Sequence, residues 1–115
     1  MSDRKSPQDS PIQTSPQAES RVADEALAGL IEEIPGWNIS VQNGIKQLEK
    51  TYSFKDFAQA LEFVNAIGEM AEAANHHPAL LLEWGKVTVR WWSHESRGLH
   101  LKDFQLAAHT DELSR

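Results

Sequence analysis

The chain has 115 residues, enough for one domain with a single hydrophobic core, and its 40% apolar and 24% charged residues are an ordinary globular balance. Its net charge of −6 and its scattered basic residues argue against nucleic acid as a partner, because phosphate contacts need clustered Lys and Arg. Without cysteine, a signal-peptide pattern or an apolar run near the roughly 20 residues of a membrane span, the chain is expected in the cytoplasm.

Residues 1–20 differ in composition from the rest of the chain. They hold five serines, three prolines and three glutamines, and no aromatic residue. Such a segment buries too little apolar surface to offset the entropy cost of ordering it. We therefore expect a disordered N-terminal tail, followed by one folded domain over residues 21–115.

The first helix is predicted from about residue 22 to residue 34, where Pro35-Gly36 ends the pattern. Asp24 and Glu25 fall in its early turns, where the helix dipole favours negative charge. Apolar residues recur at the spacing of one helix face: Val22, Ala23, Ala26, Leu27, Leu30, Ile31 and Ile34.

A hairpin is predicted next, with strands at about residues 37–42 and 45–52. Asn43-Gly44 separates these two alternating runs, and this dipeptide suits a two-residue loop because both positions favour positive φ. Such a loop would place Ile39 opposite Leu48.

A long second helix is predicted over about residues 54–75. Ser53 and Asp56 resemble a capping box at its start, and Pro78 cannot continue it. Two adjacent apolar stripes run along it: Phe57, Leu61, Val64, Gly68 and Ala71, and beside them Ala60, Phe63, Ile67, Met70 and Ala74. So wide an apolar face predicts the central buried helix of the domain.

The last third of the chain predicts two strands and a helix. Residues 80–84 and 87–92 read as strands joined by a type II′ turn at Gly85-Lys86. The final helix covers about residues 100–113, with an inward face of Leu101, Phe104, Ala107 and Ala108. The order α-β-β-α-β-β-α predicts an α+β fold, a four-stranded, mainly antiparallel sheet with the helices packed on one face.

Three histidines and two carboxylates gather in the second half of the chain. Glu72 precedes the adjacent pair His76 and His77, and His94 and Asp103 follow. The pair lies where the second helix gives way to the third strand, and His94 ends the fourth strand. Because a hairpin returns the end of its second strand to the start of its first, we expect His94 to approach the pair.

Such a cluster has two uses, metal binding and metal-free proton transfer. Adjacent histidines chelate one ion poorly, and the i, i+4 spacing of helical metal sites is absent, so proton transfer is favoured and no metal is expected. Each residue also has a structural interpretation. His76 could cap the second helix, Asp103 could cap the third, and Glu72 could be solvated surface. His100 and His109 are interpreted as structural or surface residues.

The spacing of these residues resembles that of the pterin-4a-carbinolamine dehydratases. The matching pattern is Glu72, three residues, His76-His77-Pro78, five residues, Trp84, nine residues, His94, eight residues and Asp103. The likeness extends over about residues 22–110 and includes Gly36-Trp37, Asn75, Val87, Val89 and Gly98-Leu99. Two positions depart from the family pattern: Ser93 stands where threonine is commoner, and His100 where threonine or serine often caps the helix.

The resemblance implies a dehydratase of the α+β fold that needs no metal and no cofactor and forms homodimers or homotetramers. It implies removal of water from 4a-hydroxytetrahydropterin, which aromatic amino acid hydroxylases release, to give quinonoid dihydropterin. His76, His77 and His94 would be catalytic, with His76 assisting departure of the hydroxyl and His77 or His94 acting as base.

The resemblance also implies the roles of the neighbouring residues. Glu72 and Asp103 would orient the imidazoles or the pterin, and Ser93 and Trp37 would line the pocket. The alternative is an interaction protein, a dimerisation or coactivator module on the same fold, since some relatives are thought to act in that way.

Overall fold

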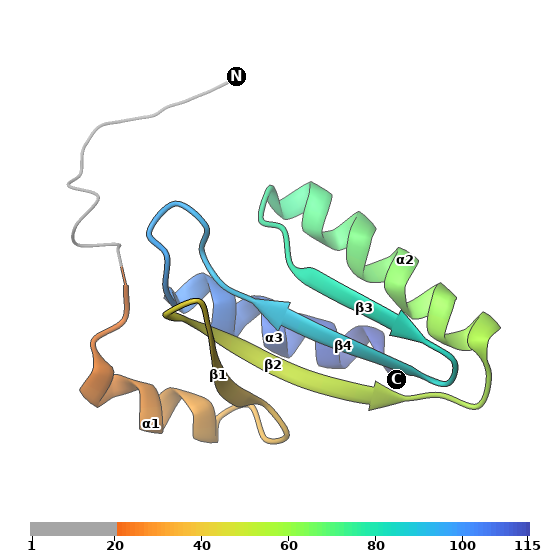
Figure 1. Ribbon diagram of the computed structural model, residues 1–115, viewed down its shortest axis with the longest axis horizontal. Helices are drawn as coiled ribbons and strands as arrows, with labels where there is room; N and C mark the ends of the chain where they lie inside the picture. Colours follow the sequence, from red (N-terminus) through yellow and green to blue (C-terminus); the bar gives the residue numbers. More distant parts are fainter. Residues whose placement is uncertain (1–20) are drawn as a thin grey trace.

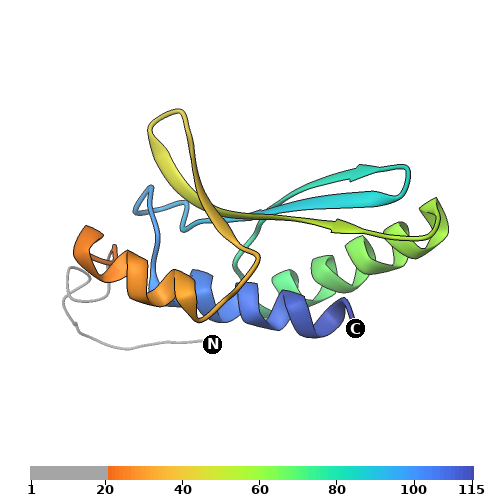
Figure 2. The same cartoon turned by 90° about the horizontal axis from the view of Figure 1, so that it is seen from below.

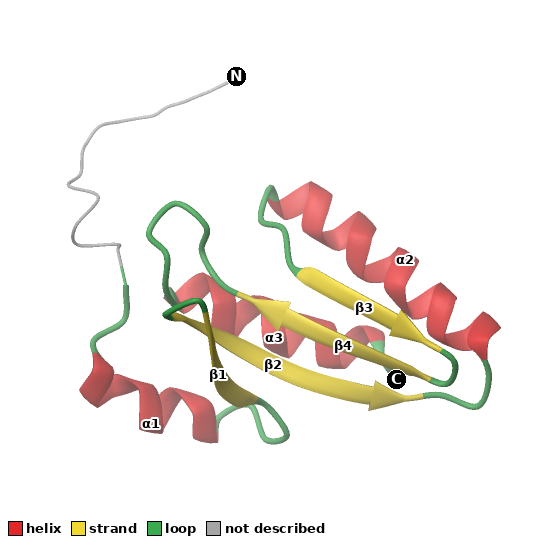
Figure 3. Ribbon diagram, viewed as in Figure 1, coloured by secondary structure: helices red, strands yellow, loops and turns green. Residues whose placement is uncertain are grey.

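Three helices and four strands follow the predicted order in the computed structural model, which describes residues 21–115 (Figure 1). The elements are α1 (Asp24–Glu32), β1 (Asn38–Gln42), β2 (Ile45–Ser53), α2 (Phe57–Ala74), β3 (Ala79–Glu83), β4 (Lys86–Trp91) and α3 (Leu101–Leu113). The strands form one antiparallel sheet in the order β1-β2-β4-β3 (Figure 3). The predicted α+β fold is therefore confirmed, and the predicted tail lies outside the described residues.

All three helices lie on one side of the sheet (Figure 2). Side chains alternate along a strand, so one face of β2 and β4 supplies the core. Its fully buried members are Leu48, Val87, Val89 and Trp91. Among residues 21–115, none of the helices has the length and hydropathy that a bilayer crossing requires.

The two hairpins differ in their turns. Ile39 pairs with Leu48 as predicted, and Asn43 and Gly44 both have positive φ, at 54° and 79°. In the second hairpin the loop is one residue earlier than predicted, because Glu83 already pairs with Lys86. Its positive φ, 75° at Gly85, falls at the second loop position, so the predicted type II′ turn is wrong.

Two features of α2 correct the sequence analysis. Asp56, not Ser53, caps the helix, since its carboxylate accepts from the Gln59 N–H at 2.9 Å while Ser53 ends β2. Of its apolar face, the buried residues are Ala60, Phe63, Ile67 and Ala71. Phe57 and Leu61 are 44% and 40% exposed, because the sheet covers only one side of the helix.

The inward face of α3 is also rotated from the predicted one. Leu101 and Ala108 are exposed, and the buried residues are Asp103, Phe104, Leu106, Ala107 and Thr110. Thr110 accepts a hydrogen bond from the Trp91 indole at 3.0 Å and donates to the Leu106 carbonyl at 2.6 Å. Polar residues can face the core here because each has a partner, which the apolar pattern alone does not show.

The C-terminal end of α3 is fastened by one carboxylate, that of Asp111. It accepts hydrogen bonds from the Trp37 indole at 3.2 Å, from the Lys50 ammonium at 2.8 Å and from the Tyr52 hydroxyl. These donors lie on β2 and on the segment before β1. Asp111 therefore ties the first hairpin to the last helix.

The contact between Tyr52 and Asp111 predicts a loss of stability at high pH. Burial first, and then Asp111, raises the pKa of Tyr52 well above its ordinary value of 10.0. A raised folded-state pKa stabilises the protein fully below pH 10, and this contribution is lost as the pH rises above it. Because lysines also titrate there, we compare the wild type with Tyr52→Phe. Above pH 10, the free energy of unfolding measured in urea should fall more steeply with pH in the wild type than in Tyr52→Phe, by at most about 1.4 kcal/mol per pH unit. Parallel curves for the two proteins would contradict the prediction.

Candidate active site

The histidine pair leaves α2 through a left-handed turn. Asn75 has φ 53°, and the N–H groups of Asn75 and His76 donate to the carbonyls of Glu72 and Ala71, each at 3.1 Å. This Schellman arrangement ends the helix at Ala74. Because the helix does not reach His76, the carboxylate of Glu72 contacts His77, the second residue of the pair.

His76 is held by a buried carboxylate. Its Nε2 lies 2.7 Å from Oδ1 of Asp103, whose side chain is fully buried, while the His76 side chain is 15% exposed. The other oxygen, Oδ2, accepts from the Ser93 hydroxyl and from the His100 N–H, both at 2.9 Å. Asp103 therefore accepts from the residue that precedes α3 and contacts His76 at the same time, so a capping role does not exclude a role at His76.

His77 and His94 complete the cluster at the protein surface. The Nε2 atom of His77 lies 3.0 Å from Oε1 of Glu72, and both side chains are exposed. The Nε2 atom of His94 lies 2.9 Å from the backbone oxygen of His77. The second hairpin thus returns His94 to the histidine pair, as the sequence analysis predicts.

The three imidazoles share one hydrogen-bonding pattern. Each places Nε2 against an acceptor, which is Oδ1 of Asp103, Oε1 of Glu72 or the His77 carbonyl. A carbonyl or an ionised carboxylate can only accept, so each Nε2 carries a proton. Each neutral ring then keeps a lone pair on Nδ1 with which to take a proton.

Trp37 is not brought together with the other predicted site residues. Its indole bonds to Asp111, about two helical turns after Asp103 on α3, and its ring packs edge-on against Tyr52 at 6.3 Å. Trp92, which the sequence analysis leaves out of the site, stacks on His94 with ring centroids 4.4 Å apart. The available signal was strand alternation, which turns Trp92 away from the buried Trp91.

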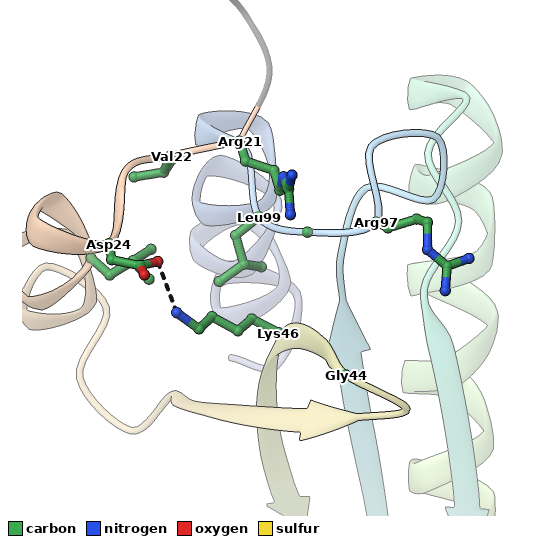
Figure 4. Close-up of a pocket in the computed structure, with 9 residues that line it drawn as sticks. Arg21, Val22, Asp24, Gly44, Lys46, Arg97 and Leu99 are labelled. Carbon is green, nitrogen blue, oxygen red and sulfur yellow. Dashed lines mark hydrogen bonds and ion pairs between the residues drawn. The ribbon is translucent and has the colours of Figure 1, made fainter.

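A separate cavity of about 190 Å³ lies beside the site, between the start of α1, the first hairpin and the segment before α3 (Figure 4). Asp24 and Lys46 form an ion pair of 2.8 Å in its wall, and the hydrogen bond from Lys46 lowers the pKa of Asp24. None of the five histidines lines this cavity. The other lining residues are Arg21, Val22, Leu27, Gly44, Arg97, Gly98 and Leu99.

Three imidazoles in one cluster can donate and accept protons, and the carboxylates of Asp103 and Glu72 contact two of them. Within residues 21–115, no three His, Asp or Glu side chains are grouped in a way that could hold one metal ion. The fold and site define a small α+β domain with a cluster of three histidines, one of which, His76, contacts a buried aspartate.

Comparison with known proteins places the domain in a family. The family model described as pterin 4 alpha carbinolamine dehydratase matches residues 20–113, and the chain belongs to that family. Two solved structures share its fold. A transcriptional coactivator/pterin dehydratase from Brucella melitensis has a TM-score of 0.75 at 22% identity, over 84% of this chain and 100% of that one. A pterin dehydratase-like protein identified as a RuBisCO assembly factor in the alpha-carboxysome has a TM-score of 0.59 at 21% identity, over 69% of this chain and 89% of that one.

Proposed function

We propose that the protein removes water from 4a-hydroxytetrahydropterin to give quinonoid dihydropterin, in the recycling of the pterin used by aromatic amino acid hydroxylases. The observation that carries the proposal is the contact of His76 with the buried Asp103. The contact of His94 with the His77 backbone brings a further imidazole to the same place. Membership of the dehydratase family supports the substrate class.

The reaction requires one proton donor and one proton acceptor. The bond from C4a to the hydroxyl oxygen breaks as that oxygen takes a proton and leaves as water. The proton on N5 passes to a base, and its electron pair forms the double bond between N5 and C4a. Positioned acids and bases contribute about 10²–10⁴ in rate to such steps.

His76 suits the role of acid, since the Asp103 carboxylate stabilises positive charge on its ring. His94 suits the role of base, because the His77 carbonyl accepts the Nε2 proton and so places the lone pair of the neutral ring on Nδ1, where it can accept a proton. Exposed His77, oriented by Glu72, would contact the pterin. Ser93 acts through Asp103.

A dehydratase assay tests the proposal. The purified protein should accelerate quinonoid dihydropterin formation, and His76→Ala and His94→Ala should each lower kcat at least about tenfold. His109→Ala is the matched control, because His109 is exposed on α3 and outside the cluster. A folded wild type that gives no acceleration would refute the dehydratase.

The alternative is an interaction protein on the same fold. The two similar structures support this alternative, because one is a transcriptional coactivator/pterin dehydratase and the other a pterin dehydratase-like protein identified as a RuBisCO assembly factor. The assay separates the two functions, since a binding module needs none of the three imidazoles. If the protein is only a binding module, His76→Ala should leave the binding of its partner unchanged.

We also propose a homodimer or homotetramer. Apolar side chains that are half exposed on α2 and on the edge strand β3 would be covered by self-association: Phe57, Leu61 and Leu81. Light scattering on the purified protein measures the state, and a monomer would contradict this part. The cytoplasmic location stays a prediction from composition.

A further inference from the structure

The loop of residues 93–98 carries His94 and is closed at its base. The Ser93 N–H donates to the Gly98 carbonyl at 2.8 Å, and the Arg97 N–H donates to the Ser93 carbonyl at 2.9 Å. Arg97 has φ 57°, a left-handed conformation that costs a residue other than glycine about 1 kcal/mol or more. Such a conformation persists only where surrounding contacts hold it.

A side chain at the tip of this loop, that of Ser96, contacts the residue before α3. Oγ of Ser96 lies 2.6 Å from Nε2 of His100, the residue that precedes the helix. The His100 N–H donates to Oδ2 of Asp103, and Oδ1 of the same carboxylate holds His76. His100 therefore connects the loop of His94 to the carboxylate that orients His76.

We propose that Ser96 and His100 form a clasp that positions His94 for catalysis. Apart from the clasp, the side-chain hydrogen bonds and ring stacking of residues 94–97 within the described part of the chain are those of the His94 ring, with the His77 carbonyl and Trp92. A ring that gains and loses a proton in every turnover is a poor anchor for the tip of its own loop, even though backbone hydrogen bonds close the loop at its base. The clasp holds the backbone independently of that ring, so both residues are positioning residues.

The clasp does not depend on one charge state of His100. A neutral ring can accept from the Ser96 hydroxyl or donate to it, and a charged ring donates to it. The contact thus survives across the range in which histidine titrates. We expect a constant positioning effect rather than a pH switch.

Two readouts test the clasp, amide hydrogen exchange of residues 94–97 and kcat of the dehydratase. Ser96→Ala and His100→Ala should each speed exchange and lower kcat by about tenfold, because small misplacements of a catalytic group are costly. The double variant should match either single variant, since one contact is removed in all three. His100→Gln, which keeps a hydrogen-bonding group, should recover part of kcat, and His109→Ala should change neither readout.

The inference rests on the proposed function, but exchange is measured without substrate. If the wild type shows no dehydratase activity but the two variants still exchange faster than it does, the dehydratase is refuted. The clasp is then only a structural contact, and its positioning role is overturned. Exchange and kcat at wild-type values in Ser96→Ala would overturn the clasp itself, as would fully additive effects in the double variant. Ser96→Ala keeps the test valid if His100→Ala fails to fold, since Ser96 lies outside the cap of α3.

Discussion

Replacing Asp103 with asparagine is expected to lower kcat by about 10²–10⁴-fold while the protein still folds. Asparagine keeps the shape of the side chain but exchanges one acceptor oxygen for an NH₂ donor. The Ser93 hydroxyl and the His100 N–H both donate to Oδ2, so the amide oxygen should take that position. The NH₂ group then faces His76, whose Nε2 must accept, and the ring proton moves to Nδ1.

The dehydratase assay measures the loss, and ¹⁵N NMR of the imidazole measures the change of tautomer. Asp111→Asn is the matched control, because it removes the other anchored carboxylate of α3, whose partners include none of the histidines. It should lower stability and keep kcat. A folded Asp103→Asn protein with wild-type kcat would show that Asp103 only caps the helix.

Replacing Asp111 with alanine is expected to lower the free energy of unfolding by about 2–4 kcal/mol. The change removes the acceptor of Trp37, Lys50 and Tyr52 together. Trp37 and Tyr52 are 4% and 7% exposed, so water cannot readily replace the lost partner. Donors left unsatisfied by a one-sided truncation retain their desolvation cost, which makes this loss larger than that of a surface ion pair.

Urea unfolding measures the change, with Glu112→Ala as the control. Glu112 is the exposed neighbour of Asp111 on the same helix, so its replacement should alter stability by no more than about 0.5 kcal/mol. The folded Asp111→Ala protein should keep most of its kcat, because the histidine cluster lies at the other end of α3. Equal stability of the two variants would show that the carboxylate contributes nothing net to folding.

The sequence alone determined the element order, the sheet and the approach of His94 to the histidine pair. These follow from local rules: apolar spacing gives the helices, and Asn43-Gly44 fixes the register of Ile39 against Leu48. The return of His94 needed only a hairpin. The predicted turn at Gly85-Lys86 had the wrong type and lay one residue late, yet the strands still paired, because many two-residue loops join antiparallel strands.

Only the tertiary structure decided which partner each polar side chain takes. Asp103 and Thr110 face the core while Leu101 is exposed, since burial follows available hydrogen-bond partners as well as hydropathy. Likewise Glu72 reaches His77, because a left-handed Asn75 ends α2 before His76. Trp37 bonds to Asp111, and His100 contacts Ser96. Such pairings join residues distant in sequence or separated by a turn, and their geometry is set only when the helices pack on the sheet.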